Sequence, residues 1–493
     1  DKTGTLTQNK MQVAQPLLFS GHNEEELFQT AALASKQENR DPIELPIFQY
    51  LAKHFPDAEK KSYRQISFTP FDPIRKRSEA VIEQDGERFT AMKGAAQVLL
   101  GMAQLSEEAT RKINQSVDEL AGKGYRSLAV GRKQGEAPLE LLGLIPLYDP
   151  PREDSKQVIA EMNDYGVKVK MVTGDNLAIA REIGRLLGLP QHTLRASQLY
   201  NHESTIVELI ESADIFAEVV PEDKYRIVDS LQKGGHIVAM TGDGVNDAPA
   251  LKKADCGIAV SNATDAARAA ADIILTGPGL GVINEAIQQA RITFERMKSY
   301  SIFRIAETIR IILFMALAIV VFNFYPITAL MIILLALLND IPILAIAYDR
   351  TKVDDKPVRW NMPEMLTISS ILGISGVLSS FLLFYILVEW HLPTALIQSM
   401  FFAKLTVAGH GTIYNTRIDD WFWKKPYPSR LLFSATFSTR ILGTLIAVYG
   451  IFITPIGWTY ALAMWAYALA WFLFNDVVKM GTYRILRRRG MDI

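Results

Sequence analysis

The pattern of apolar and polar positions divides the chain near Tyr300. Before it, short apolar runs alternate with frequent charges of both signs, as in soluble domains. Beyond it, long apolar stretches are separated by short charged segments. A helix needs about 20 apolar residues to cross a bilayer. Six stretches reach this length and are expected to span a membrane: Ile302–Phe324, Ile327–Tyr348, Leu366–Val388, Thr394–Tyr414, Leu431–Phe452 and Pro455–Phe474. The fourth is the least apolar because it contains Lys404 and His410.

Much of the first half has the pattern of an α/β domain. Val167–Thr173 and His236–Thr241 have the composition of buried parallel strands, and each is followed by Gly-Asp. Leu177–Leu187 has the apolar spacing of a helix. Strands that alternate with helices predict a doubly wound α/β sheet.

Between about Gln8 and Leu142 the pattern changes to helices and strands joined by turns. Ala80–Ile82 and Arg88–Met92 flank Gln84-Asp85-Gly86, which is typical of a β-hairpin. This segment is therefore expected to form a separate α+β domain, inserted into the α/β domain.

The distribution of basic residues predicts the orientation of the apolar segments, because cytoplasmic loops are rich in Lys and Arg. An even number of spans places both ends on one side. The loops Asn323–Pro326 and Glu389–Pro393 contain neither Lys nor Arg. The segments after the second, fourth and sixth spans are basic: Arg350, Lys352, Lys356, Arg359, Arg417, Lys424, Lys425, Arg430, Arg484, Arg487, Arg488 and Arg489. The soluble half and the C-terminus are thus expected in the cytoplasm, and the formal net charge of −1 gives no reason to expect a nucleic-acid partner.

Three short segments contain residues suited to phosphate chemistry: DKTGTLT at 1–7, Thr173–Asp175, and TGDGVND at 241–247. An aspartate beside small residues can attack the γ-phosphate of ATP if cations and amide groups surround it. Asp243 and Asp247 offer the carboxylate oxygens that Mg²⁺ prefers. A Thr-Gly-Asp segment alone usually marks a turn. The first and third segments together, in this order, are very specific for phosphate chemistry.

These segments resemble those of the P-type ATPases, whose phosphorylation domain has the haloacid dehalogenase-like fold. The resemblance covers nearly the whole chain. It implies that Asp1 is phosphorylated by ATP and that Mg²⁺ is bound by Asp1, Thr3, Asp243 and Asp247. It also implies that Lys224, in Val220–Lys224, contacts the phosphate. Further residues are implied in the catalytic site: Thr173, Gly174, Asp175 and Asn246.

The inserted segment resembles the nucleotide-binding domain of the same family. Phe71 lies where the family stacks adenine, and Lys93-Gly94 matches its nucleotide-contacting motif. Taken alone, Phe71 is more often a core aromatic residue and Lys93 a solvated charge, but their order between the first and second phosphate segments favours nucleotide contacts for both. Asp149–Arg152 matches the hinge between the two soluble domains, and Arg152 is counted with the nucleotide-binding residues.

The apolar half contains ionisable residues that indicate ion transport, because charges inside a membrane are costly. Asp340 lies mid-segment after Asn339 and close to Pro342, which frees backbone carbonyl groups. Arg310 either provides the countercharge to Asp340, the reading we favour, or extends to the interface. Glu307 is expected to be solvated or structural. Lys404, His410 and Arg440 either hold helices together or mark a polar path.

A proton suits this segment better than Ca²⁺, which takes 6–8 oxygen ligands. The sequence is similar to the plasma-membrane proton-pump branch, of the prokaryotic type, in Thr308–Ile311, Leu337–Asp340, Ala347–Asp349 and Gly257–Arg268. By this resemblance Asp340 carries the proton, with Arg310 and Asn339 beside it. Another cation such as Mg²⁺, Ca²⁺ or K⁺ remains open. So do a membrane-anchored phosphohydrolase that moves no ion and an inactive membrane fragment.

The expected organisation is therefore a multidomain protein. Residues 1–7 and 143–298 form the haloacid dehalogenase-like phosphorylation domain, and 8–142 the nucleotide-binding domain. Residues 299–480 form a six-helix transmembrane bundle in the plasma membrane, and 481–493 a cytoplasmic tail. The family also has an actuator domain and four earlier helices, so the chain is expected to be the C-terminal part of a pump.

Overall fold

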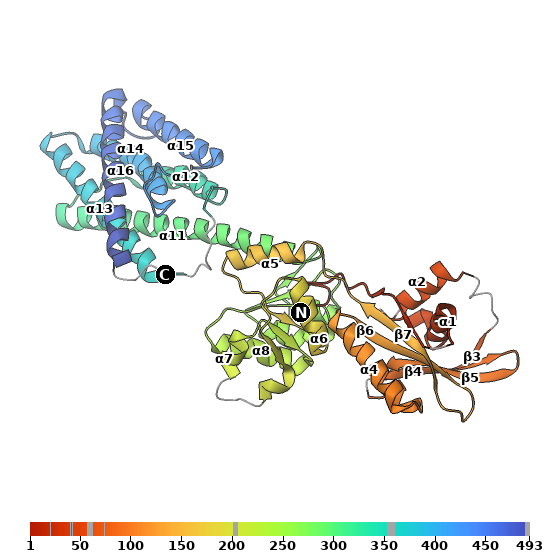
Figure 1. Cartoon of the computed structure of the whole chain (residues 1–493). Helices are drawn as coiled ribbons and strands as arrows, with labels where there is room; N and C mark the ends of the chain where they lie inside the picture. Colours follow the sequence, from red (N-terminus) through yellow and green to blue (C-terminus); the bar gives the residue numbers. More distant parts are fainter. Residues whose placement is uncertain are drawn as a thin grey trace. The chain divides into compact units, whose positions relative to one another are not determined.

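The computed structural model describes residues 1–19, 21–39, 41, 43–56, 63–72, 74–200, 206–352 and 360–488 (Figure 1). The chain forms two compact units, Asp1–Glu285 and Ala286–Ile493. Lys356, Arg359 and Arg489, which contributed to the predicted orientation, lie outside the described residues. Each unit is described by itself.

The α/β part of the first unit contains two parallel sheets of three strands, instead of the single sheet that the sequence predicted. One has the order β8-β10-β9 and the other β11-β12-β13. Asp1 and Lys2 lie between them, with the Lys2 amide 3.1 Å from the Val172 carbonyl oxygen and the Asp1 nitrogen 3.1 Å from that of Thr241. Backbone contacts of Asp1 and Lys2 thus connect the two sheets, where the sequence predicted a single sheet. The strands are β8 (Met171–Val172), β9 (Thr193–Arg195), β10 (Ile215–Ala217), β11 (Ala239–Gly242), β12 (Cys256–Ala259) and β13 (Ile273–Ile274).

Short helices surround these strands. Predicted Leu177–Leu187 is observed as α6, which begins at an Asn176 side chain that accepts from the Ile179 amide. Pro221 begins α8, a position where its missing N–H costs no helical hydrogen bond. The helices are α5 (Ser155–Asp164), α6 (Leu177–Leu186), α7 (Ile206–Ser212), α8 (Pro221–Lys233), α9 (Ala248–Lys253) and α10 (Asp265–Ala270).

The inserted part contains a seven-stranded antiparallel sheet with the order β1-β7-β6-β5-β4-β3, in which β2 also pairs with β7. The predicted hairpin is confirmed, because β4 pairs with β5 around Asp85 and Gly86. Both turn residues have positive φ, 52° and 86°, as a tight two-residue hairpin requires. The strands are β1 (Gln12–Val13), β2 (Leu17–Leu18), β3 (Arg64–Asp72), β4 (Arg77–Gln84), β5 (Glu87–Ala95), β6 (Arg126–Lys133) and β7 (Glu140–Tyr148).

Four helices cover the two faces of this sheet. Successive residues of a strand point to opposite faces. Ala129 and Leu144 belong to the apolar cluster under α3 (Ala96–Met102) and α4 (Glu107–Gly122). Their neighbours Val130 and Ile145 belong to the cluster under α1 (Glu24–Leu33) and α2 (Leu45–His54). The inserted part is therefore an α+β domain with two cores.

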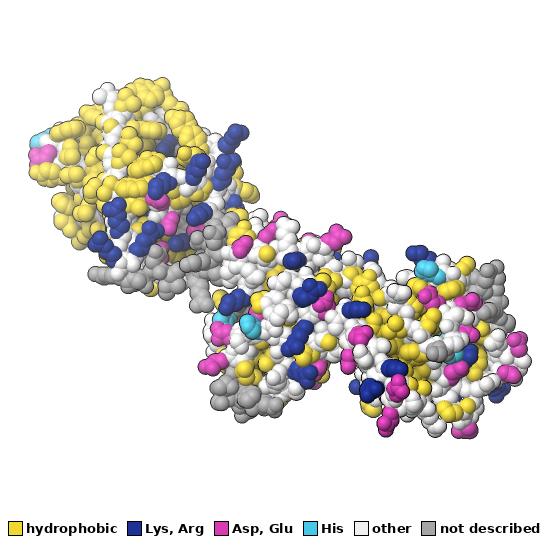
Figure 2. Space-filling view, viewed as in Figure 1, with side chains coloured by type: hydrophobic (Ala, Val, Ile, Leu, Met, Phe, Trp, Pro, Cys, Tyr) yellow, Lys and Arg dark blue, Asp and Glu magenta, His cyan; other side chains and the backbone are white. Residues whose placement is uncertain are grey.

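The second unit is a bundle of six long helices, five of which are long and apolar enough to cross a membrane by length and composition among the described residues. Apolar side chains cover much of its visible surface (Figure 2). The helix outside these five is α14, which contains Lys404 and His410 and is the most buried of the six. The predicted fourth segment is therefore a helix. Because other helices surround it, it can contain polar residues that lipid would not tolerate. The helices are α11 (Gly281–Phe322), α12 (Ala329–Ile346), α13 (Met362–Glu389), α14 (Thr394–Thr416), α15 (Arg430–Tyr449) and α16 (Gly457–Arg488).

Candidate active site and ion site

Asp1 lies in a cluster of charged side chains at the ends of the parallel strands. Lys224, in the first turn of α8, places its Nζ 3.0 Å from Asp1 Oδ1 and 2.6 Å from Asp247 Oδ1. Carboxylate oxygens of Asp1, Asp243 and Asp247 all lie within 4.8 Å of one another. The structure thus brings together four of the predicted residues from three separate segments.

Backbone geometry fixes this cluster. The Oδ2 of Asp247 accepts from the amides of Asp243 and Gly244, both at 3.2 Å. A Cβ on Gly242 would lie 2.5 Å from the Asp247 Cβ, so only glycine fits there. Gly4 has φ of +72°, in the left-handed region that favours glycine. These glycines allow the backbone of both loops to approach the carboxylates closely.

The electrostatics of the cluster suit a divalent cation. Burial raises the pKa of Asp243, and the Asp247 charge raises it further. Burial also raises the pKa of Asp247, but Lys224 outweighs this and lowers it overall. Lys224 forms ion pairs with Asp1 and Asp247, whereas no basic side chain among the described residues forms one with Asp243. Three carboxylates around one point match the oxygen ligands of Mg²⁺, which would neutralise their charge and that of a bound phosphate.

The remaining predicted catalytic residues lie around this cluster. Thr3 is half-buried in the turn after Asp1, and Asn246 is exposed beside Asp247. Thr173 is buried at the end of β8, and Gly174 is exposed. The Thr173 hydroxyl donates to Asp175 Oδ2 at 3.1 Å and accepts from the Asp175 amide at the same distance. Thr173 thus orients Asp175.

Asp175 connects three parts of the chain. Its Oδ2 accepts from Lys2 Nζ at 2.5 Å, and its Oδ1 accepts from Arg126 Nε at 2.9 Å. Arg126 begins β6 in the inserted domain. Burial raises the pKa of Asp175, but the charges of Arg126 and Lys2 outweigh it and hold the value at about 2. Because Lys2 follows Asp1, this carboxylate also positions the proposed nucleophile.

The predicted hinge contacts the segment that follows Asp1. The Thr7 hydroxyl donates to Asp149 Oδ2 at 2.5 Å, and the Lys10 amide donates to Asp149 Oδ1 at 3.1 Å. Arg152 donates from its amide to the Leu6 carbonyl at 3.1 Å. Its Nη2 also lies 3.4 Å from the Gly4 carbonyl oxygen. Arg152 therefore contacts the phosphorylation loop through both its amide and its side chain.

The predicted nucleotide-binding residues share one end of the antiparallel sheet. Phe71, near the end of β3, is 57% exposed, so it is not a core residue. Arg77 pairs with both Asp72 and Gly94, which brings β3, β4 and β5 together at that end. A Cβ on Gly94 would lie 2.4 Å from the Lys76 carbonyl oxygen, so the strand meets this turn closely.

Lys93 is buried and paired within the domain. Its Nζ donates to Glu44 Oε1 at 2.5 Å, to Ser78 Oγ at 3.0 Å and to the Ala34 carbonyl at 3.1 Å. Burial lowers the pKa of Lys93, and Glu44 partly offsets this. The reading as a solvated charge is therefore wrong. Its role toward a nucleotide remains a prediction, because all its described partners lie inside the domain.

In the helical bundle, Arg310 pairs with Glu307 instead of Asp340. Arg310 Nη2 donates to Glu307 Oε1, and its Nη1 lies 3.5 Å from Thr412 Oγ1. Residues three apart lie on the same side of a helix, which explains this pairing. The structure thus does not pair Arg310 with Asp340, as we had favoured from the sequence. Asp340 is exposed on α12, while Asn339 is buried.

Glu307 is only 3% exposed and pairs with Arg310, which excludes the solvated alternative and fits the structural one. Lys404 is also buried, and its Nζ donates to Ser380 Oγ of α13 at 2.7 Å. His410 lies 3.5 Å from Thr439 of α15. Arg440 lies over the Tyr414 ring at 5.5 Å. These three contacts join neighbouring helices, which fits the prediction that Lys404, His410 and Arg440 hold helices together.

Several partners in these sites were not predicted from the sequence. Glu307 and Arg310 are three apart in a helical pattern, and this spacing could have revealed their pair. Lys2 stands inside the first motif. Arg126 and Glu44 have no local signal, because only the tertiary fold brings them to Asp175 and Lys93.

Comparisons with known proteins extend over the whole chain. The haloacid dehalogenase-like hydrolase family matches residues 1–255. A Methanocaldococcus jannaschii protein assigned by name to the cation-transporting ATPases is 54% identical over 100% of this chain. Plasma membrane ATPase 1 of Saccharomyces cerevisiae is 39% identical over 91% of the chain, and the Neurospora crassa plasma membrane ATPase 37% over 92%. The chain spans 62% of the archaeal relative and 51% of each fungal one.

Proposed function

Because the chain belongs to the haloacid dehalogenase-like hydrolase family and is homologous to ATP-hydrolysing cation transporters, we propose that it is the catalytic and C-terminal membrane part of a P-type proton pump. The pump exports protons across the plasma membrane at the expense of ATP. The soluble unit and the C-terminus lie in the cytoplasm. The observation that carries the catalytic part is the cluster of Asp1, Lys224, Asp243 and Asp247.

In the proposed reaction, a carboxylate oxygen of Asp1 attacks the γ-phosphorus of ATP, and the bond from that phosphorus to the ADP oxygen breaks. Asp1, Asp243 and Asp247, with Thr3 beside them, would hold Mg²⁺, which would supply positive charge to the phosphate oxygens. Lys224, 3.0 Å from Asp1, holds a positive charge where the transferred group arrives. Asp175 keeps Lys2, and hence the Asp1 backbone, in place through a 2.5 Å contact.

We assign the nucleotide base to the end of the antiparallel sheet that carries Phe71. An exposed aromatic ring offers a stacking surface, and an aromatic ring contributes about 1–3 kcal/mol per stacked base. Gly94 lets the neighbouring turn approach, and Lys93 fixes the strand beneath through Glu44. Arg152, beside Gly4, acts at the phosphate end instead.

The choice of a proton rests on the small number of oxygen ligands around the membrane carboxylates. Ca²⁺ would need 6–8 oxygens. Asp340 has no described ion-pair partner, and its neighbour Asn339 provides one amide oxygen. A carboxylate can carry a proton alone. The similarity to fungal plasma membrane ATPases supports the same assignment.

The experiment that tests this proposal is ATP-driven acidification of vesicles containing the complete pump. The wild type and Glu389→Gln, an exposed control at the end of α13, should acidify the interior equally. Asp340→Asn should lose at least tenfold in proton flux. An interior that stays neutral during ATP hydrolysis, or full proton transport by Asp340→Asn, would contradict the proposal. Uptake of another cation would identify that cation as the substrate, and ester hydrolysis without transport would indicate a phosphohydrolase.

A further inference from the structure

Glu307 and Asn339 leave buried acceptor oxygens without partners in the middle of the bundle. Glu307 Oε2 and Asn339 Oδ1 accept no hydrogen bond from any residue that the structure describes. Both residues border the space beside Gly409. A Cβ built there would lie 3.2 Å from Arg310 Nη2, 3.4 Å from Glu307 Oε1 and 3.7 Å from Asn339 Oδ1. A buried acceptor without a partner is costly, so Glu307 Oε2 and Asn339 Oδ1 each call for a hydrogen-bond donor.

We propose that Glu307 is a second proton-carrying carboxylate of the pump, and that Arg310 stabilises its ionised form. This inference rests on the proposed proton transport. A proton bound to Oε2 would turn that acceptor into a donor, which the surrounding acceptor oxygens can satisfy. An ionised Glu307 is instead stabilised by the guanidinium of Arg310, three residues along α11.

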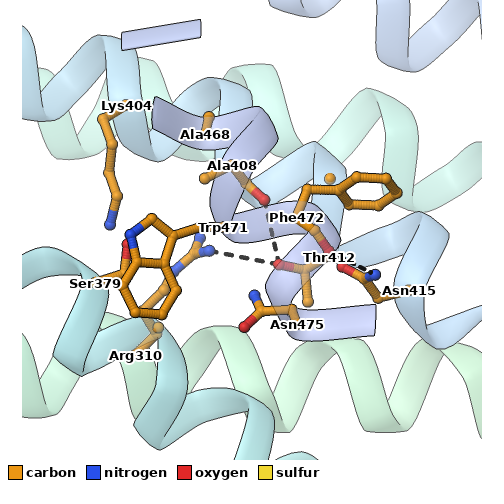
Figure 3. Close-up of a pocket in the computed structure, with 12 residues that line it drawn as sticks. Arg310, Ser379, Lys404, Ala408, Thr412, Asn415, Ala468, Trp471, Phe472 and Asn475 are labelled. Atoms are coloured by element: carbon orange, nitrogen blue, oxygen red, sulfur yellow. Dashed lines mark hydrogen bonds between the residues drawn. The ribbon is translucent and has the colours of Figure 1, made fainter. Parts of the chain in front are cut away.

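A small cavity lies beside Arg310 (Figure 3). It measures about 10 Å³, which is room for about one water molecule, and Arg310 forms part of its wall. Beside it lie Thr412, already 3.5 Å from Nη1, and Asn415, whose Oδ1 accepts from no described residue. A Cβ on Gly376 would lie 2.5 Å from the Arg310 Cδ, so this glycine leaves space for the arginine stem.

Other ionisable groups lie on the helices around the pair. Lys404 of α14 borders the same cavity, and its Nζ donates to Ser380 Oγ. When Glu307 takes up a proton, its attraction for Arg310 falls, so the ion pair favours the ionised form. The other ionisable groups on the neighbouring helices are His410 of α14, Arg440 of α15 and Asp340 of α12.

The test compares protons moved per ATP hydrolysed in vesicles with the complete pump. Glu307→Gln cannot ionise and should lower this ratio at least twofold, whereas Glu307→Asp should keep it. The matched control is Glu364→Gln. Glu364 is a buried carboxylate that does not line the cavity, and its Oε1 lies 3.2 Å from Lys298 Nζ. This variant should have the ratio of the wild type. An unchanged ratio in Glu307→Gln would overturn the inference. If the wild type acidifies no vesicle, the proposed function itself fails, which is a separate result.

A second measurement applies if Glu307→Gln does not fold. The infrared difference between ATP-free and phosphorylated wild-type pump should contain a band of a protonated carboxyl group. Glu307→Asp should shift that band, because the changed side chain alters the carboxyl surroundings. A band at the same position in both proteins, or no such band, would refute proton binding by Glu307.

Discussion

Replacement of Asp175 by Asn should destabilise the soluble unit and weaken its response to acid. The change keeps the shape of the side chain but removes the charge that faces Lys2 and Arg126. Lys2 is the critical partner, because its side chain is 7% exposed, whereas that of Arg126 is 50% exposed and can be solvated. Asp175→Asn therefore leaves one buried cation without its counterion.

The magnitude follows from two estimates. A pKa lowered from 3.8 to about 2 corresponds to roughly 2 kcal/mol at neutral pH. Removal of one partner of a fully buried pair costs about 3–5 kcal/mol. The half-exposed Arg126 favours the lower estimate, so we expect about 2 kcal/mol. Because the folded pKa lies below the unfolded one, this contribution is present above about pH 4 and is lost as the pH falls toward 2.

The assay is urea unfolding of residues 1–285 at pH 7 and near pH 2.5. The wild type should exceed Asp175→Asn in stability at pH 7, and the difference should shrink at the lower pH. Asp118→Asn, an exposed carboxylate on α4, is the matched control and should change stability by less than about 0.5 kcal/mol. Equal stability of the wild type and Asp175→Asn at pH 7, or a difference that persists in acid, would refute the reasoning.

Three further changes test the soluble unit. Phe71→Ala should weaken ATP binding about tenfold with an unchanged melting temperature, and Phe71→Trp should bind normally; equal affinities in calorimetry would exclude stacking. Lys93→Met should lower stability by about 3 kcal/mol, since it leaves Glu44 buried and unpaired, and adding Glu44→Gln should restore part of it; no recovery in urea titrations would contradict the pair. Gly242→Ala should displace Asp247 and reduce phosphorylation at least tenfold in a filter assay, and normal phosphorylation would show that the loop adapts.

Much of the fold could be predicted from the sequence because its signals are local. The Asp85-Gly86 turn marks the β4–β5 hairpin, and stretches of about 20 apolar residues mark the membrane helices. The grouping of Asp1 with Asp243 and Asp247 could also be predicted, because their segments resemble the phosphate-site motifs of the P-type ATPases. α14 gave a weaker signal, since a helix enclosed by protein does not need an apolar surface.

The partners of charged residues could not be predicted in the same way. Lys93 and Glu44 are brought together by packing of α2 against the sheet, and Arg126 meets Asp175 only through the tertiary fold. Arg310 was assigned to Asp340 because both are charged within apolar segments. The closer carboxylate on its own helix, Glu307, takes that place in the structure, which changes which side chains are expected to carry the ion.

The most direct test of the central claim is the covalent state of Asp1 during ATP hydrolysis. The complete pump, incubated with ATP labelled at the γ-phosphate and quenched in acid, should carry label that hydroxylamine releases and that peptide mapping places on Asp1. Asp1→Asn should carry none and hydrolyse no ATP, while Asp118→Asn should be labelled like the wild type. ATP hydrolysis by Asp1→Asn, or label on another residue, would contradict the account.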